Sequence, residues 1–355
     1  MRIVHVLGTR PNFVKMAPVI AAARERFGSE SSLVVHTGQH YDRTMSEIFF
    51  EELGVGRPDH MLGVGSGTHS QQAARVLARL EPVLREARPD LVLVPGDVNS
   101  TLAAALCASR LQIPVGHVES GLRSFDRTMP EEVNRIVADH LSELLFLHCS
   151  EAEDNLRAEG VEETRYRFVG NTMIDTLVAL EHRFRDRGAA GSLGVEPGTY
   201  LLVTLHRPAL VDGPLLGDAI VALERVATTM PVVFPVHPRT RKMLGERTPA
   251  GLTLTDPAGY LDFLSLEADA RAVLTDSGGI QEETTYLGIP CFTLRDNTER
   301  PVTVRAGTNT LLGLAPARIA EIPELLGGAP AIRPQPPEKW DGQAARRVAE
   351  ILADC

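Results

Sequence analysis

The sequence predicts an α/β protein with two parallel β-sheets, each covered by helices on both faces. Short β-branched runs alternate along the chain with turn residues and helical patterns, an order that is typical of βαβ units. The alternation comes in two series, and a stretch rich in glycine, alanine and charged residues separates them at 183–197. The length of 355 residues agrees with two domains, because a domain holds about 150 residues on average.

The first series predicts the elements of the first sheet. Apolar runs indicate buried strands at 2–7, 33–37, 91–95 and 115–118. Helical patterns, each following a strand and a turn that contains glycine, are expected from Pro11, near 45–53 and over 101–110. A junction between the domains is expected near 168–171, before a helix at 172–180.

The second series predicts the second sheet. Its strands are expected at 200–205, 232–236, 252–254 and 272–275, with helical segments between them. A proline-rich stretch at 330–337 interrupts the chain before a last helix at 343–353.

Composition excludes several classes of function. The chain has 36 basic and 46 acidic residues, a net charge of −10 that repels nucleic acids and anionic membranes. Its apolar stretches fall short of the ~18 residues of a membrane span, and the run at 3–7 is too short for a signal peptide. Scattered cysteines without metal-ligand spacing indicate reduced thiols in a cytoplasmic protein and no metal: Cys107, Cys149, Cys291 and Cys355.

The strongest binding motif is TDSGGIQEE at 275–283. In parallel sheets ligands bind at the carboxyl ends of strands, and here a buried strand leads through Gly278 and Gly279 into a helix. Backbone N–H groups at such a turn can approach a phosphate, with Ser277 beside them. Glu283, one turn into the helix, could then accept hydrogen bonds from ribose hydroxyls. The alternative is a plain glycine-rich turn with an N-cap; the segment is neither a Walker loop nor a GxGxxG fingerprint.

Carboxylates follow two strands of the first series and begin a helix. Asp97 and Glu119 each end a strand, although Asp97 could be only a helix N-cap. Glu131 and Arg135 fall on one face of the helix that starts at 130, where a simple surface pair would also explain them. Three carboxylates at neighbouring ends form a plausible acid–base set. The opposite face of that helix is apolar, with Val133, Ile136, Val137 and Leu141.

Basic residues follow three further strands. Arg10 opens a helix after the first strand and Lys15 could face the same anion pocket, although a tight turn with a solvated arginine is an equal alternative. His206 and His237 each close a strand beside an arginine. Lone histidines are more often structural, but the position of His206 at the ligand edge favours a functional role.

Taken together, nine segments in this order and spacing resemble the non-hydrolysing UDP-N-acetylglucosamine 2-epimerases over nearly the whole chain. They are GTRPNFVKMAP (8–18), HTGQHYD (36–42), PGDVNSTLA (95–103), GHVESGLRSFDRTMPEEVNR (116–135), VGNTMID (169–175), LHR (205–207), PVHPRT (235–240), TDSGGIQEE (275–283) and RDNTERP (295–301). The resemblance implies a GT-B fold, in which two Rossmann-like domains face a cleft and the terminal helix returns to the first domain. The domains expected are 1–169 with 343–355, and 170–342. A homodimer is also expected.

The resemblance further implies interconversion of UDP-N-acetylglucosamine and UDP-N-acetylmannosamine without a cofactor, through elimination of UDP to 2-acetamidoglucal and re-addition. Acid–base work then falls to Asp97, Glu119 and Glu131, with support from Arg135. Contacts with the diphosphate and nucleotide fall to Arg10, Lys15, His206 and Arg300, where His206 also counts as catalytic. The remaining substrate contacts implied are a phosphate loop at Ser277, Gly278 and Gly279, a ribose ligand at Glu283 and a uracil-pocket residue at Phe263.

Some positions depart from the family pattern. Pro208 follows His-Arg where relatives continue toward Glu-Asn, and Val302 replaces the usual glutamate. A second, allosteric UDP-N-acetylglucosamine site is matched by Gln39, Glu132 and His237 but not by Asp42 or Pro208. The alternatives are an epimerase of a modified UDP-sugar (a 2,3-diacetamido uronate or an antibiotic precursor), a hydrolysing epimerase, a GT-B glycosyltransferase and an inactive nucleotide-sugar sensor.

Overall fold

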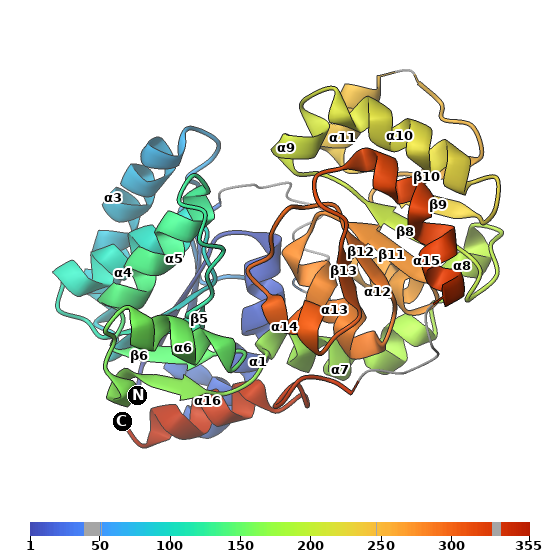
Figure 1. Ribbon diagram of the computed structural model, residues 1–355. Coiled ribbons are helices and arrows are strands. Elements are labelled where there is room, and N and C mark those ends of the chain that lie inside the picture. Colours follow the sequence, from blue (N-terminus) through green and yellow to red (C-terminus); the bar gives the residue numbers. More distant parts are fainter. Residues whose placement is uncertain (39–49, 51, 246, 329–334) are drawn as a thin grey trace. The chain divides into compact units, whose positions relative to one another are not determined.

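The computed structural model describes residues 1–38, 50, 52–245, 247–328 and 335–355 (Figure 1). The chain divides into two compact units: unit 1 is Met1–Ala179 with Glu338–Cys355, and unit 2 is Leu180–Pro337. The division falls inside helix α7 (Thr172–Arg185), beyond the expected boundary at 169. The first half of α7 is bound to unit 1, because Thr176 Oγ1 donates to the carbonyl of Val14 at 2.6 Å.

Unit 1 contains a seven-stranded parallel sheet in the order β3-β2-β1-β4-β5-β6-β7. The expected strands of the first series are present, and β3, β6 and β7 are additional. Their bounds are β1 (Ile3–Leu7), β2 (Ser32–His36), β3 (His60–Met61), β4 (Leu91–Pro95), β5 (Val115–Ser120), β6 (Leu144–Leu147) and β7 (Tyr166–Phe168). The sheet is buried on both faces, since every residue of β1 and β4 is buried, and this explains the continuous apolar runs.

Helices connect these strands. They are α1 (Arg10–Phe27), α3 (His69–Ala87), α4 (Asn99–Arg110), α5 (Pro130–Leu141), α6 (Glu151–Ala158), α7 and the terminal α16 (Ala344–Ala353), with single 3-10 turns at Ser29–Ser31 and Glu163–Arg165. The terminal helix belongs to unit 1 and packs against α1. Its N-terminus is capped by Asp175, whose carboxylate accepts the N–H groups of Ala344 and Ala345. Most of the helix expected near 45–53 lies outside the described residues.

Unit 2 contains a six-stranded parallel sheet in the order β10-β9-β8-β11-β12-β13. Its strands are β8 (Leu201–Thr204), β9 (Val232–Pro235), β10 (Leu252–Thr255), β11 (Ala272–Thr275), β12 (Cys291–Thr293) and β13 (Asn309–Leu311). Leu201 and Val203 pack into one core cluster, whereas Tyr200 and Leu202 pack into another. Alternate residues of this region therefore face opposite sides of the sheet, and both sides carry a core.

Helices again join the strands of unit 2. They are α8 (Ala189–Ser192), α9 (Pro208–Val211), α10 (Leu215–Val226), α11 (Pro238–Leu244), α12 (Tyr260–Ala268), α13 (Gly278–Leu287), α14 (Pro301–Arg305) and α15 (Ile322–Gly328), with a 3-10 segment at Pro316–Glu321. Each unit is thus a parallel α/β structure, which confirms the predicted fold class. Within the described ranges, no helix is both long and apolar enough to span a membrane.

Candidate functional site

In unit 1, Glu119 is turned toward Lys15 by an irregularity at the end of β5. The pairing of β5 with β6 shifts register between Val118 and Ser120, and Glu119 there adopts a left-handed backbone with φ +66°. Such a conformation costs on the order of 1–3 kcal/mol in a residue other than glycine and is often found at functional sites. The result is a buried ion pair in which Lys15 Nζ lies 2.6 Å from Glu119 Oε1.

Gly96 makes room for this ion pair. It follows β4 and has φ +61°, so that its backbone conformation already favours glycine. A Cβ atom at this position would lie 3.2 Å from Lys15 Nζ and 3.7 Å from Glu119 Oε1. The glycine of the PGD segment therefore has a local reason that the sequence alone did not reveal.

Asp97 meets the guanidinium of Arg135. Arg135 Nη2 donates to Asp97 Oδ2, and Nη1 donates to Glu132 Oε2. The alternative in which Asp97 only caps the following helix is wrong, because the N-cap of α4 is Val98 and it makes no side-chain cap. Asp97 and Arg135 instead form an ion pair at the end of β4, with the arginine 2% exposed.

The orientation of α5 differs from the one expected. Arg135 is buried, so it is not part of a surface pair with Glu131, which lies half-buried in the first turn. Val133, which belongs to the apolar face of this helix, is 43% exposed. The buried positions are mostly polar: Glu132, Asn134, Arg135, Ala138 and Asp139. Hydrophobic periodicity failed here because buried charges on this helix are paired and hydrogen-bonded, which removes most of the cost of burying them.

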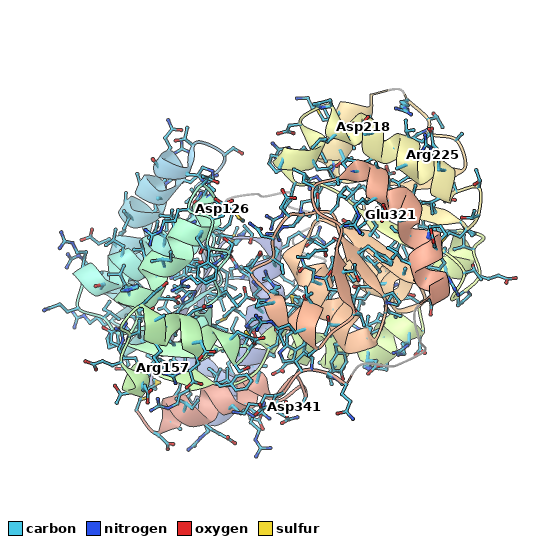
Figure 2. All side chains as sticks on the ribbon, viewed as in Figure 1. Asp126, Arg157, Asp218, Arg225, Glu321 and Asp341 are labelled. Atoms are coloured by element: carbon cyan, nitrogen blue, oxygen red, sulfur yellow. The ribbon has the colours of Figure 1, made fainter. Side chains whose placement is uncertain are left out.

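Glu132, expected in an allosteric site, holds the loop before α5. Its carboxylate accepts the N–H and hydroxyl of Ser124, each at 2.9 Å, and the N–H of Phe125 at 2.8 Å. It also binds Arg135, so this loop and the Asp97 pair are joined through one carboxylate. Figure 2 shows the side chains on the ribbon, with Asp126 of the same loop labelled.

Arg10 lies exposed at the start of α1. Its N-cap, Thr9, is held by Asn12, whose Oδ1 accepts the N–H groups of Gly8 and Thr9 at 3.1 and 3.2 Å. Asn12 therefore fixes the turn that precedes Arg10.

In unit 2, the two glycines begin α13 as expected, and Gly278 has a steric reason to be glycine. Ser277 is the N-cap, and Gly278 and Gly279 form the first turn. A Cβ on Gly278 would lie 2.5 Å from Arg300 Nη1. Arg300 is buried against this turn, with Nη1 at 2.6 Å from Glu299 Oε1 and Nε at 3.0 Å from Glu282 Oε1.

Glu299 is ionised within this cluster. Burial alone would raise the pKa of its carboxyl, but Arg300 and Arg295 hold that pKa well below its usual range. Arg295 Nη2 donates to Glu299 Oε2 at 2.8 Å, and Arg207 Nη2 lies 3.9 Å from Oε1. Three arginines thus gather around one carboxylate near the N-terminus of α13, so the surroundings favour an anion.

His206 is oriented by Asp276, a residue that the motif contained but that was not singled out. Asp276 Oδ2 accepts the N–H groups of His206 and Arg207 at 2.9 and 2.8 Å, and Oδ1 lies 3.2 Å from His206 Nδ1. His237 lies beside His206 with ring centroids 5.5 Å apart and caps α11 by accepting the N–H of Arg239. The two histidines therefore do meet at one edge of the sheet.

Glu283 lies buried between α12 and α13. Tyr260 donates its hydroxyl to Glu283 Oε1 at 3.0 Å. Burial raises the pKa of Glu283 to about 8. The charge of Glu282 raises this pKa further, whereas the hydrogen bond from Tyr260 lowers it. Glu267, also on α12, is fully buried, and burial raises its pKa well above the usual range. Phe263 shares this helix and packs, partly buried, against the core cluster of Tyr200.

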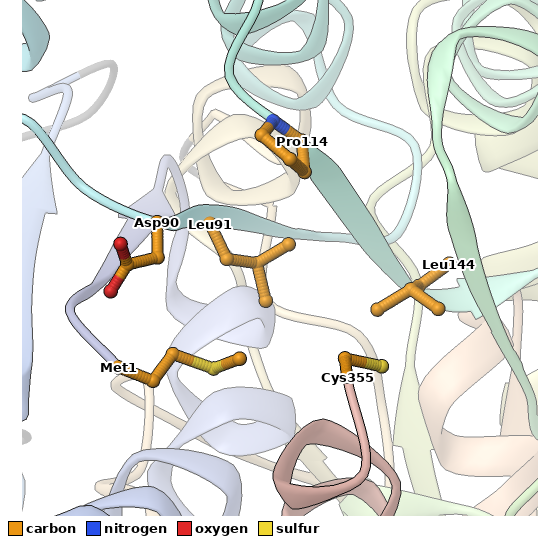
Figure 3. Close-up of a pocket in the computed structure, with 6 residues that line it drawn as sticks. All are labelled: Met1, Asp90, Leu91, Pro114, Leu144 and Cys355. Carbon is orange, nitrogen blue, oxygen red and sulfur yellow. The ribbon is translucent and has the colours of Figure 1, made fainter.

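Gln39 lies outside the described residues. A pocket in unit 1 lies at the amino ends of strands, whereas Asp97 and Glu119 follow or end strands at their carboxyl ends (Figure 3). It is lined by Met1, Asp90, Leu91, Pro114, Leu144 and the terminal Cys355. Where the structure is described, no group of three or more histidine, cysteine, aspartate or glutamate side chains could hold a metal ion.

Known proteins resemble the chain along its whole length. A UDP-N-acetylglucosamine 2-epimerase from Methanocaldococcus jannaschii is 42% identical over 366 residues, covering 99% of each chain. The UDP-2,3-diacetamido-2,3-dideoxy-D-glucuronate 2-epimerase of Pseudomonas aeruginosa is 42% identical over 360 residues, again covering 99% of each chain. A crystal structure of the UDP-GlcNAc 2-epimerase from M. jannaschii in complex with UDP-GlcNAc and UDP matches with a TM-score of 0.91 and 39% identity, covering 100% of both chains.

The chain matches a model of the family as well as single relatives. The model described as UDP-N-acetylglucosamine 2-epimerase matches residues 24–353, which includes both units. The two parallel α/β units agree with the GT-B fold that the motifs imply. The chain belongs to the UDP-N-acetylglucosamine 2-epimerase family.

Proposed function

We propose that the protein interconverts UDP-N-acetylglucosamine and UDP-N-acetylmannosamine by eliminating UDP and adding it back. The observation that carries the proposal is the pairing of two strand-end carboxylates with buried cations in unit 1: Asp97 with Arg135, and Glu119 with Lys15. Family membership, with 42% identity to an epimerase over the full length, supports the same reaction.

The chemistry explains why several acid–base groups are needed. The C2 proton of the sugar is not acidified by a neighbouring carbonyl, so direct removal and return would be very slow. In the proposed elimination, a base takes the C2 proton while the C1–O bond breaks, and the electron pair of that bond leaves with UDP. The product is 2-acetamidoglucal. Re-addition delivers a proton to the other face of C2 and re-forms the C1–O bond, so an acid or base is required on each face.

Asp97, Glu119 and Glu131 are the proposed acid–base groups. Arg135 keeps Asp97 at the end of β4 and balances its charge. Lys15, expected at the diphosphate, is held by Glu119 in the structure, so we propose that it serves the carboxylate as well.

Unit 2 supplies most of the proposed nucleotide contacts, whereas Arg10 belongs to unit 1. N–H groups of Ser277, Gly278 and Gly279 would bind the diphosphate, and developing charge on departing UDP would be stabilised by these dipoles. Arg300 would contribute positive charge from its buried place against this turn, with His206 and Arg10 as further contacts. Glu283 would bind the ribose hydroxyls and Phe263 the uracil.

The alternatives are separated by chemistry. A glycosyltransferase would share the anion-binding turn but would not need the carboxylates of unit 1. A diacetamido uronate is the substrate in the name of one relative at 42% identity, and nothing in the described side chains favours it over UDP-N-acetylglucosamine. The homodimer stays a prediction, which light scattering coupled to size-exclusion chromatography tests directly.

The deciding experiment is proton NMR of UDP-N-acetylglucosamine incubated with the protein in D2O. We expect UDP-N-acetylmannosamine to form with deuterium at C2, because the transferred proton comes from a group that exchanges with solvent. Product without deuterium would contradict elimination. Free UDP and N-acetylmannosamine as the main products would indicate a hydrolysing enzyme.

A further inference from the structure

We infer that His117 is a positioning residue for this reaction, because it holds in place the turn that carries Asp97. The inference rests on the proposed acid–base role of Asp97. His117 is on β5 and fully buried, and its Nε2 atom lies 2.7 Å from the carbonyl oxygen of Gly96.

The turn after β4 is held at three consecutive carbonyl oxygens. The three donors come from three different elements, α4, β5 and α5. The hydrogen bonds run from Thr101 Oγ1 to Pro95, at 2.6 Å, from His117 Nε2 to Gly96, at 2.7 Å, and from Asn134 Nδ2 to Asp97, at 2.9 Å. Such side-chain donors fix both the position and the tilt of the peptide that precedes the Asp97 side chain. A strand end that served only as a turn would not require all three.

His117 is itself locked from behind. Its Nδ1 atom lies 2.7 Å from Asp139 Oδ1, and the other oxygen of Asp139 accepts Arg123 Nη1 at 2.7 Å and the N–H of Gly121 at 3.1 Å. Arg123 in turn donates two hydrogen bonds to Glu159, the C-cap residue of α6. The ring therefore cannot rotate without breaking this buried hydrogen-bond network.

The two ring nitrogens have different tasks, and this difference can be tested. A carbonyl oxygen only accepts, so Nε2 must carry a proton and donate to Gly96. The other nitrogen, Nδ1, faces Asp139 Oδ1 at 2.7 Å, and Arg123 holds the second oxygen of the same carboxyl group. The Nε2 bond positions Asp97, whereas the Nδ1 bond anchors the ring.

Two amide variants separate these bonds. In His117→Gln the amide nitrogen can occupy the place of Nε2, so the bond to Gly96 is kept and the bond to Asp139 is lost. In His117→Asn the amide nitrogen falls near Nδ1, so the bond to Asp139 is kept and the bond to Gly96 is lost. We expect the Asn variant to lose kcat by on the order of 10- to 100-fold, and the Gln variant to lose much less. KM and UDP affinity should change little in both, because most of the proposed nucleotide contacts are in unit 2 and none of them is part of the turn after β4.

A second pair of variants covers the case in which His117 variants fail to fold. Thr101→Val removes the donor to Pro95 O and keeps the shape of the side chain. Thr176→Val removes a matched hydroxyl, which donates to the carbonyl of Val14 at the same 2.6 Å and lies off the turn. Thr101→Val should lower kcat severalfold without weakening UDP binding, whereas Thr176→Val should lower only the midpoint of thermal unfolding.

The outcomes are separable from those of the proposed function. If wild-type protein does not place deuterium at C2, the proposed reaction fails and His117 has nothing to position. Wild-type protein could place deuterium at C2 while kcat falls equally in His117→Gln and His117→Asn, in proportion to their loss of stability. In that case His117 is only structural. Equal kcat in Thr101→Val and Thr176→Val would likewise overturn the positioning role.

Discussion

Gly278 and Arg300 occupy adjoining space: a Cβ on the glycine would come within 2.5 Å of the guanidinium nitrogen Nη1. The backbone of Gly278 has no positive φ, so its conformation alone does not require glycine. The requirement is steric, and it comes from an arginine fixed by Glu282 and Glu299. Gly278 was expected to let a phosphate approach the backbone. In the structure its missing Cβ also leaves space for the guanidinium of Arg300 beside the same turn.

Gly278→Ala should therefore displace Arg300 and lower both the folding stability and the affinity for UDP. Overpacking of a filled site typically costs about 1–3 kcal/mol of folding free energy, and the shifted guanidinium should also reduce UDP affinity. Denaturant unfolding and titration calorimetry with UDP measure the two effects. The matched control is Gly217→Ala in α10, where a Cβ meets nothing within 4 Å and should stabilise by up to about 1 kcal/mol. Unchanged stability and UDP affinity in Gly278→Ala would show that Arg300 moves aside freely.

Glu283 should make nucleotide binding depend on pH. Its pKa of about 8 lies above the usual 4.5 mainly because of burial, so the carboxyl is mostly protonated at pH 7. Ribose hydroxyls donate hydrogen bonds and favour the ionised form, so binding should release a proton, and affinity should rise from pH 7 toward 8. Calorimetry in two buffers of different ionisation enthalpy measures the released proton. Glu283→Gln should lose this release, and the difference between the two proteins cancels the ionisation of UDP itself.

The same shift has a consequence for stability, with a defined sign. The folded pKa of Glu283 is raised, so ionisation is disfavoured in the folded state and stability falls as pH rises from about 4.5 to about 8. Glu283→Gln should flatten the free energy of unfolding over this window relative to wild type. A pH dependence that persists unchanged in the Gln variant would assign the effect to another group, of which the buried Glu267 is the first to test.

Thr176 compensates for a proline inside α1. Pro18 has no N–H to donate to the carbonyl of Val14, and Thr176 Oγ1 donates to it instead at 2.6 Å. Thr176→Val keeps the side-chain shape but leaves a buried carbonyl unpaired, which should cost about 1–3 kcal/mol in denaturant unfolding. Thr228→Val removes an exposed hydroxyl that also donates to a carbonyl, and its effect should stay within about 0.5 kcal/mol. Similar losses in both variants would contradict this explanation.

Strands could be predicted where an apolar run and a turn coincide, as at β1, β4 and β11. The short strand β13, with sequence Asn-Thr-Leu, could not, since its stability comes from pairing with β12 rather than from its own composition. The boundary inside α7 was also not predictable, because it depends on contacts of Thr176 and Asp175 with residues far away in the sequence.

In the candidate site, the sequence correctly predicted that Asp97 and Glu119 lie at the ends of strands. It did not predict their ion-pair partners, Arg135 and Lys15. Spacing on a helix suggested Glu131 as the partner of Arg135, whereas the structure brings Arg135 to Asp97, 38 residues away. The left-handed turn at Glu119 could not be foreseen, because nothing in the residues around it requires positive φ. Helical periodicity indicates neighbours on one helix, and contacts between elements depend on the fold.

The carboxylates of unit 1 provide the test of mechanism. Asp97→Asn and Glu131→Gln should each lower turnover by ~10²–10⁴, the usual contribution of a positioned general acid or base. UDP affinity should change far less, since most of the proposed nucleotide contacts belong to unit 2. Glu81→Gln removes a carboxylate from an exposed pair with Arg85 on α3 and should leave turnover unchanged.

One of the variants Asp97→Asn, Glu119→Gln and Glu131→Gln should also release the intermediate. If a substitution slows re-addition more than elimination, UDP and 2-acetamidoglucal accumulate and can be detected by NMR, whereas wild-type protein should release them only slowly. The released glycal would show directly that C1–O cleavage precedes protonation at C2. Near-normal turnover in both Asp97→Asn and Glu131→Gln would remove these residues from the reaction, and the Asp97–Arg135 pair would then be a purely structural link between β4 and α5.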